Sequence, residues 1–447
     1  MQQLSEMDCT FLQQESPRTP MHISPVIVYD QSNVKRGPVR YKEILDVFRN
    51  SLHKSTLFRR KLAGGAGGLD APYWVEDPHF DLEFHVRHIA LPKPGDWRQF
   101  CILLARLQSR GLDMTRPLWE AYVIEGLNGV EGLPDKSFAI MLKVHHAAID
   151  GVSGAEIVTA IHSLSDQLED AEVVDTWESE PNPSSWHIWS RAYAHNLKRP
   201  VTFFQKARQL VPAVIRANKS KENVEATDKT PMVRTRFNDR VTAARVTDAI
   251  IIDLDTIKAI RREVGQVTVN DVVVSIVGGA MRRYLASKDE LPDTSLSCGA
   301  PVSLRNERNS ESTGNQVSNI TISMATDIED PVERLLAVHR SSEEAKAYAS
   351  ELGTSVLMDV SEVMIPLLLG WGMQAVTFAG AGAQVPVPSH TIISNVPGPQ
   401  MPLYLAGARV HLMMGMGPLL HMMGLFHAVL SGAGKVTINF TCCREML

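Results

Sequence analysis

The sequence predicts an α/β protein of two domains. Its 447 residues exceed what one hydrophobic core usually organises, and 44% hydrophobic with 21% charged residues is the composition of a globular protein. Short apolar runs of strand type alternate with stretches of helical spacing. The net charge of −5 argues against nucleic acid as the main partner. Five cysteines without a metal or disulfide pattern indicate a reducing cytosol.

The first part of the chain alternates between short strands and helices. Residues 26–29 have the apolar character of a strand, and residues 41–52 have apolar positions at helical spacing. Residues 100–112 predict a second helix, and residues 121–124 predict a second strand. The glycines at 64–68 lack the Gly-Lys-Ser/Thr ending of a phosphate-binding loop, so we expect a flexible hairpin tip there.

The most informative segment is residues 145–151, His-His-Ala-Ala-Ile-Asp-Gly. It closes an apolar run at 138–144, and a helical pattern follows it. We therefore expect the histidines at a strand end, and Asp150 and Gly151 in the turn that enters a helix. A neutral imidazole in such a place can take a proton from a hydroxyl and return it to a leaving group.

The two histidines are expected to have different tasks. Successive strand residues face opposite sides of a sheet, so His145 and His146 cannot enter one cleft in the same way. One should face the reactants while the other supports the frame, and alternation does not decide which. Asp150 is close enough to brace the turn, and Gly151 allows a tight backbone. Zinc would need more ligands than the next histidine, His162, supplies. A purely structural histidine pair is the alternative.

A change of charge marks a boundary near residue 180. Residues 166–180 hold seven acids and no Lys or Arg, whereas residues 186–219 hold seven Lys or Arg, no acid, and several aromatic residues. A basic, aromatic, helical stretch is typical of a segment that lies on an anionic membrane surface. The alternative is an interdomain helix with a solvated basic face. The chain is thus divided into an N-terminal lobe (1–180), a basic helical linker (181–230) and a C-terminal lobe (231–447).

The second half starts with a strand at 249–254 and a helix at 271–285, with Asn270 as its expected N-cap. Another strand precedes residue 301. Residues 363–434 contain a single charged residue, Arg409, but no unbroken apolar stretch long enough to span a membrane. Methionines are pliable, gap-filling side chains, and their density here predicts an apolar pocket for a long flexible chain, with a large core as the alternative. They are Met413, Met414, Met416, Met422 and Met423.

Several blocks resemble the bacterial wax ester synthase/acyl-CoA:diacylglycerol acyltransferase family. They run in order along nearly the whole chain: Leu4-Ser5 through Pro20-Met21-His22, Pro117-Leu118-Trp119, residues 145–151, Asn270-Asp271, Ser303-Leu304-Arg305, and Ser394-Asn395-Val396-Pro397-Gly398-Pro399. The resemblance implies two chloramphenicol-acetyltransferase-like α/β lobes with an active-site tunnel at their interface. It also implies that His146 is the general base and that Asp150 is structural, paired with Arg59 or Arg60.

The resemblance implies transfer of a long-chain acyl group from acyl-CoA, as co-substrate, to a fatty alcohol, to diacylglycerol, or to both. No bound cofactor and no metal are expected. The residues expected at the substrates are Asn270 (also a candidate oxyanion donor), Asp271, Ser303, Arg305, Ser394 and Asn395. We expect a cytoplasmic protein in peripheral contact with the inner face of the cell membrane and with lipid droplets. The alternatives are an amide-forming condensation-type enzyme, a small-molecule acetyltransferase and a non-catalytic lipid-droplet or lipid-binding protein.

Overall fold

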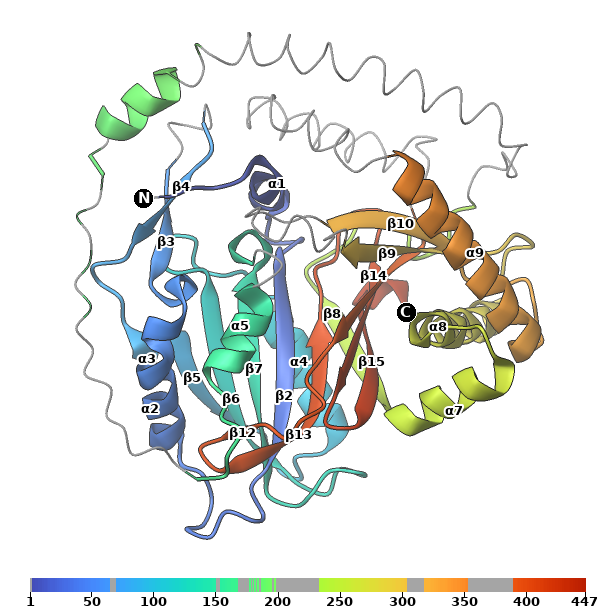
Figure 1. Cartoon of the computed structure of the whole chain (residues 1–447), viewed down its shortest axis with the longest axis horizontal. Helices are drawn as coiled ribbons and strands as arrows, with labels where there is room; N and C mark the ends of the chain where they lie inside the picture. Colours follow the sequence, from blue (N-terminus) through green and yellow to red (C-terminus); the bar gives the residue numbers. More distant parts are fainter. Residues whose placement is uncertain are drawn as a thin grey trace.

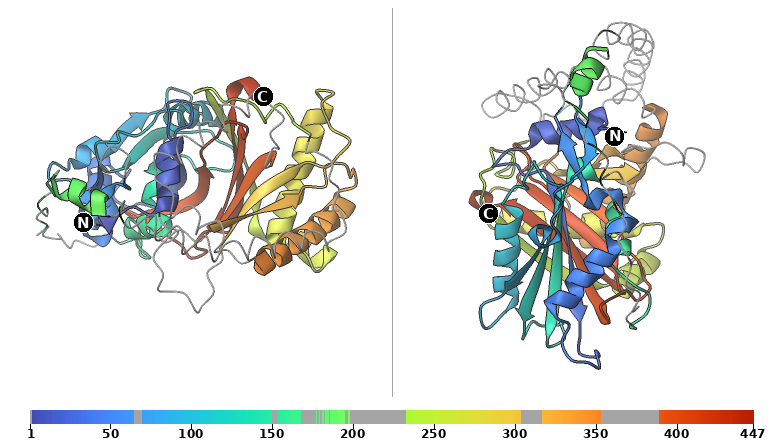
Figure 2. Two further views of the ribbon diagram at one scale, coloured as in Figure 1. Left: turned by 90° about the horizontal axis from the view of Figure 1, so that it is seen from above. Right: turned by 90° about the vertical axis from the view of Figure 1, so that its left-hand side faces the viewer.

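The computed structural model describes residues 2–64, 70–149, 153–167, 233–303, 317–352 and 389–447, together with part of 177–197. Two six-stranded sheets carry the fold, and helices pack against them (Figure 1). Seen from above in Figure 2, the N-terminal part, in blue and cyan, stands beside the part drawn in yellow and orange. The predicted α/β class is confirmed.

The first sheet has the strand order β12-β13-β2-β7-β6-β5, with β7 (Ser137–His145) in its interior. Every residue of β7 is buried, because α2 (Tyr41–Ser51) and α5 (Ser153–Ala160) cover one face of the sheet and α4 (Trp97–Gln108) covers the other. A strand buried on both faces has a continuous apolar sequence. The other strands are β2 (His22–Asp30), β5 (Val86–Ala90), β6 (Trp119–Leu127), β12 (Tyr404–Leu405) and β13 (Ala408–Met416).

A small sheet of order β1-β4-β3 lies beside the first lobe, formed by β1 (Gln2–Gln3), β3 (Arg60–Ala63) and β4 (Tyr73–Glu76). Strands β3 and β4 are antiparallel, but residues 65–68 of the expected hairpin tip lie outside the described residues. Helix α1 (Glu6–Gln14) follows β1, with Ser5 as its N-cap. In Figures 1 and 2, α1 sits at the seam between the two large sheets.

The second sheet has the order β10-β9-β11-β14-β15-β8, and β11 runs parallel to both β9 and β14. One hydrophobic core joins this sheet to its helices α7, α8 and α9. The strands are β8 (Arg245–Asp253), β9 (Ser297–Ser303), β10 (Val317–Ser323), β11 (Thr391–Pro397), β14 (Leu425–Gly432) and β15 (Lys435–Cys443). The helices are α7 (Leu254–Val264), α8 (Val269–Ala286) and α9 (Pro331–Leu352), and α3 (Leu82–His85) is a short helix of the first lobe.

The two sheets do not follow the expected division of the chain at residue 231. Strand β13 comes from the C-terminal part of the sequence, yet it pairs antiparallel with β2 in the first sheet. Strand β12 extends that sheet by one more strand. The C-terminal segment therefore leaves the second sheet after β11, contributes two strands to the first lobe, and returns for β14 and β15.

Two expected helix starts are wrong, and the caps explain both. Helix α4 begins at Trp97, three residues before the expected start, because Asp96 accepts a hydrogen bond from the Gln99 amide and caps the helix. Helix α8 begins at Val269 with Thr268 as its N-cap, so Asn270 lies inside the helix. Asp271 completes the capping box by accepting the Thr268 amide at 2.8 Å.

The methionine-rich segment is largely core. Met413, Met414 and Met416 lie on β13, are buried, and pack inside the two cores of the first sheet. For these three methionines burial favours the alternative of a large core, and the pocket for a flexible chain stays a prediction. Among the described residues, no single helix has the length and hydropathy of a membrane span; α7 and α8 reach that composition only together, with a bend of 98° between them.

Candidate active site

The neighbouring strands hold the histidine pair by its backbone. Strand β7 ends at His145, and a single 3-10 turn, His146–Ala148, follows it. The His145 amide donates to the Leu118 carbonyl at 3.0 Å, just before β6 begins. The His146 amide donates to the Met21 carbonyl at 2.8 Å, just before β2 begins. Both histidines are thus fixed where the interior strand β7 ends, beside the starts of β2 and β6.

His145 has the contacts of a frame residue. Its side chain is 1% exposed. Its Nδ1 accepts a hydrogen bond from the Ala147 amide at 3.1 Å, which places the proton of the neutral ring on Nε2. Nε2 lies 3.4 Å from Oε2 of Glu15. These contacts favour His145 for the supporting task that alternation left open.

His146 is partly exposed, and one face of its ring is covered. Phe11 of α1 stacks on the imidazole with 3.9 Å between ring centroids and 20° between ring planes. Burial lowers the pKa of His146 to about 4, and the nearby His145 contributes in the same direction. The ring is therefore neutral near pH 7, which is the protonation state that a general base requires.

Asp150 and Gly151, the acid and the glycine of the motif, lie outside the described residues. Of the two candidate arginines, Arg59 is buried and its guanidinium lies 4.3 Å from the centroid of the Trp177 ring. Arg60 is tied to the Gln2 side chain at 3.3 Å in an exposed contact. Burial favours Arg59, and its pairing with Asp150 stays a prediction.

The second lobe brings together two of the expected substrate residues. Oδ1 of Asn270, at the second position of α8, accepts from Nδ2 of Asn395 on β11 at 3.4 Å. Ser394 precedes Asn395 on β11 and therefore faces the opposite side of the sheet. Ser303 is the last residue of β9, and Arg305 lies outside the described part of the chain.

Asp271 occupies the place of a structural carboxylate. It is fully buried, it caps α8, and its Oδ2 lies 2.9 Å from Nδ1 of His339 on α9. Hydrogen bonds from Thr268 and His339 outweigh burial and lower the pKa of Asp271. This geometry favours a role in joining α8 to α9 over the expected substrate contact.

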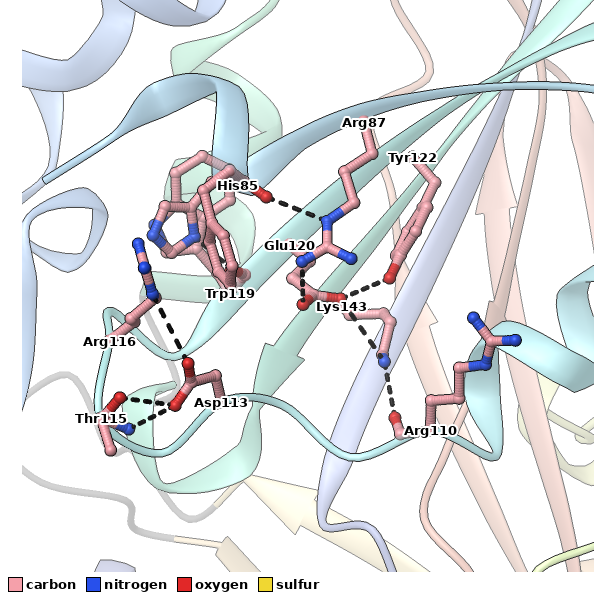
Figure 3. A network of polar contacts seen from close by, with 11 residues as sticks. His85, Arg87, Arg110, Asp113, Thr115, Arg116, Trp119, Glu120, Tyr122 and Lys143 are labelled. Carbon is pink, nitrogen blue, oxygen red and sulfur yellow. Dashed lines mark hydrogen bonds and ion pairs between the residues drawn. The ribbon is translucent and has the colours of Figure 1, made fainter.

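A largely buried charge network centred on Glu120 joins β5, β6 and β7, the strand that ends at the histidine pair (Figure 3). Three side chains converge on the Glu120 carboxylate: the Tyr122 hydroxyl donates to it at 2.5 Å, Arg87 lies at 3.1 Å and Lys143 at 3.8 Å. Lys143, fully buried on β7, also donates to the Arg110 carbonyl at 2.6 Å. Burial lowers the pKa of Lys143 from its ordinary value of 10.5 to about 8.

Sequence reasoning missed Phe11, Glu15 and this network. Glu15 was visible only as one of several acids in a polar N-terminal stretch. Lys143 did carry a signal, since a lysine inside an apolar strand needs a buried partner. The structure also gives Trp119, of the Pro117-Leu118-Trp119 block, a structural task. The Trp119 indole donates to the Phe58 carbonyl at 3.0 Å and stacks on His85. Among the described residues, no group of three His, Cys, Asp or Glu is arranged to hold a metal ion.

The chain matches two family models. Residues 4–273 match the wax ester synthase/diacylglycerol acyltransferase catalytic domain, and residues 313–447 match the C-terminal domain of the same family. A probable diacylglycerol O-acyltransferase of Mycobacterium tuberculosis is 32% identical over 98% of this chain and 93% of its own length. A diacylglycerol O-acyltransferase homologue of Mycobacterium bovis has the same identity and coverage.

Solved structures agree with these matches. The wax ester synthase/diacylglycerol acyltransferase of Marinobacter aquaeolei VT8 superposes with a TM-score of 0.68 and 28% identity, covering all of this chain and 94% of that one. The first condensation domain of the calcium-dependent antibiotic synthetase gives a TM-score of 0.55 at 15% identity, over 99% of this chain and 90% of that one. At that identity the second likeness concerns the fold alone.

Proposed function

The chain belongs to the wax ester synthase/diacylglycerol acyltransferase family, and from that premise we propose that it moves a long-chain fatty acyl group from CoA to a hydroxyl. The acceptor is a fatty alcohol, diacylglycerol, or both. The observation that carries the proposal is the histidine turn, in which one imidazole is fixed as a frame and the next is neutral, partly exposed and stacked on Phe11 of α1.

In this mechanism His146 takes the proton of the acceptor hydroxyl while the oxygen attacks the thioester carbonyl. The tetrahedral oxyanion then collapses and breaks the carbon–sulfur bond. The CoA thiolate leaves and takes the proton back from the imidazolium, so the enzyme returns to its starting state. Proton transfer by a positioned side chain is worth about 10²- to 10⁴-fold, and orientation of the two substrates must supply the rest.

Asn270 is the side chain that we propose as donor to the oxyanion. Its contact with Asn395 uses Oδ1 as acceptor, which orients Nδ2 away from that contact as a donor. Ser303, Arg305 and Ser394 are proposed to contact the substrates from the second lobe, across a tunnel at the interface of the lobes. Acyl-CoA is the proposed co-substrate.

Membrane contact is proposed through the helix at 186–194. Trp186, Trp189 and Tyr193 are 81%, 50% and 69% exposed, and they fall within an arc of about 60° at 100° per residue. Two residues tie the helix to the first lobe, because Ala192 is buried and Arg191 lies 6.0 Å from the Tyr73 ring centroid. Exposed aromatic residues next to basic ones suit the headgroup layer of an anionic membrane. The proposed location is the cytoplasmic face of the cell membrane and lipid droplets.

An acyl-transfer assay tests the reaction. Purified protein receives labelled acyl-CoA with hexadecanol and diacylglycerol in competition, and free thiol is followed alongside the product. We expect thiol release that depends on the added acceptor, and loss of most of it in His146→Ala with the fold retained. Near-normal turnover by a folded His146→Ala protein would reject the base, and no acceptor-dependent thiol release would favour a lipid-binding protein instead.

Flotation with anionic liposomes tests the membrane contact. We expect Trp186→Ser with Trp189→Ser to lose most of the flotation, and neutralisation of Lys198, Arg199, Lys206 and Arg208 to reduce it in a salt-dependent way. Tyr348→Ser is the matched control, because Tyr348 is an exposed aromatic residue on α9. Unchanged flotation of the double tryptophan variant would reject this surface.

A further inference from the structure

Helix α1 and the residue that ends it contact both members of the histidine pair. The side chain of Phe11 lies face to face with His146, and Glu15, the C-cap of α1, reaches His145. Leu4 and Cys9 pack against Ala147, in the turn that carries His146. A nine-residue helix thereby covers the strand end where the proposed reaction takes place.

The Glu15 carboxylate joins the frame in two directions. Its Oε2 accepts a hydrogen bond from the Met21 amide, and the Met21 carbonyl accepts from the His146 amide at 2.8 Å. The same oxygen lies 3.4 Å from Nε2 of His145, the ring nitrogen that carries the proton when Nδ1 accepts from Ala147. An ionised Glu15 therefore favours one tautomer of His145 and one position of the strand that holds the His146 backbone.

The Phe11 ring acts on His146 directly. A stack at 3.9 Å leaves no room for water on that face of the imidazole and restricts rotation about its χ2 angle. Because burial is the main cause of the low pKa of His146, the part of that burial which Phe11 supplies must contribute to it. Other titratable groups near this turn, among the described residues, are His145 and Glu15, His22 opposite His145 on β2, and Asp8 and Cys9 on α1.

We propose that Phe11 and Glu15 are positioning residues for the acyl-transfer base, and that α1 is the element that fixes the orientation of the His146 ring. This inference rests on the proposed role of His146. It adds that the base is held from the N-terminal helix as well as from the end of β7, which leads into its turn.

The test compares Phe11→Leu with Phe11→Tyr. Leucine fills the site but cannot stack, whereas tyrosine keeps the stacked ring. For Phe11→Leu we expect kcat to fall about tenfold with KM for both substrates unchanged within about twofold, because a misplaced base slows chemistry more than binding. We also expect the acid limb of the pH–rate profile to move from about pH 4 towards 6.5, as the imidazole becomes more hydrated. Phe11→Tyr should restore both values.

Matched controls and a second variant complete the experiment. Phe84→Leu makes the same substitution in a phenylalanine that packs on Arg116. Glu15→Gln removes the charge at His145 and should lower kcat several-fold with KM unchanged, and it carries the test if Phe11→Leu does not fold. Glu125→Gln is its control, since Glu125 makes a comparable contact with His88 at 3.1 Å.

The outcomes separate the two proposals. Full activity of His146→Ala would reject both the proposed role of His146 as the base and this inference. An inactive His146→Ala with wild-type kcat and an unmoved acid limb in both Phe11→Leu and Glu15→Gln overturns the positioning role alone. A Phe11→Leu protein whose kcat falls while its acid limb stays near pH 4 contradicts the role of the stack, since a general loss of packing predicts that result.

Discussion

Replacing the buried Lys143 by methionine should change how stability depends on pH. The folded state lowers the pKa of Lys143 from 10.5 to about 8, chiefly through burial, with Arg87 acting in the same direction and Glu120 opposing it. The folded protein therefore binds this proton less tightly than the unfolded chain does. Below pH 8 the lysine is charged in both states and the fold carries the whole cost of that burial. The cost disappears as pH rises from about 8 to 10.5.

The size of this cost in stability follows from the two pKa values of Lys143. A difference of about 2.5 pKa units corresponds to about 3 kcal/mol at pH 7, and to about 1.5 kcal/mol at pH 9.5. Lys143→Met removes this cost and also removes the hydrogen bond to the Arg110 carbonyl, worth about 1 kcal/mol. Glu120 retains Arg87 and Tyr122 as partners. We expect Lys143→Met to be as stable as the wild type at pH 7, or more stable by up to about 2 kcal/mol.

The assay is urea unfolding of both proteins between pH 7 and pH 9.5. The difference in unfolding free energy should move in favour of the wild type by about 2 kcal/mol over that range. Groups that titrate equally in both proteins cancel in this difference. Lys258→Met, at a side chain that is 58% exposed, reports the effect of losing a surface lysine. A wild-type-minus-variant difference that stays flat with pH, or a Lys143→Met protein that is several kcal/mol less stable at pH 7, would refute the reasoning.

Three further results are expected. Because the pKa of His146 is about 4, kcat/KM should stay level from pH 8 down to about pH 5.5 and fall only as pH approaches 4; a profile that breaks near 6.5 would contradict this burial. Gly278→Ala should lower the free energy of unfolding by about 1–3 kcal/mol, because the alanine Cβ would lie 2.5 Å from the Met324 carbonyl oxygen. Alanine otherwise favours a helix, so a higher urea midpoint would show that this contact relaxes. Trp119→Ala should cost about 3–5 kcal/mol, and Trp119→Phe about 1–3, since the second keeps the ring stack but leaves the Phe58 carbonyl without its donor; equal midpoints for the two variants would contradict that separation.

Features that depend on local sequence could be predicted. The apolar run before the histidines is buried on both faces of its sheet, so its sequence shows the strand directly. The histidine pair at its end marks the candidate site for the same reason. The family resemblance extended this reading to the whole chain, because its blocks are spread from the first residues to β11.

Features that depend on distant contacts could not be predicted. Alternation of strand residues did not choose between the two histidines, and only the family resemblance named His146. The contact that distinguishes them comes from Glu15, which is separated from His145 by most of the sequence of the first lobe. The membership of β13 in the first sheet was hidden as well, since a buried strand has the same apolar sequence in either sheet. Helix starts were missed where a cap outside the apolar pattern, at Asp96 or Thr268, set the first turn.

The return of the chain to the first sheet also sets an order of events during synthesis. Until the ribosome has passed residue 416, β2 is an edge strand whose backbone groups lack β13 as a partner, and the core around Val26 and Val28 lacks Leu412, Met414 and Met416. The first lobe, although it begins the sequence, is among the last parts that can be completed. A nascent chain that stalls before that point exposes an unpaired edge strand. A protein truncated there would be prone to aggregate and would not form a smaller enzyme.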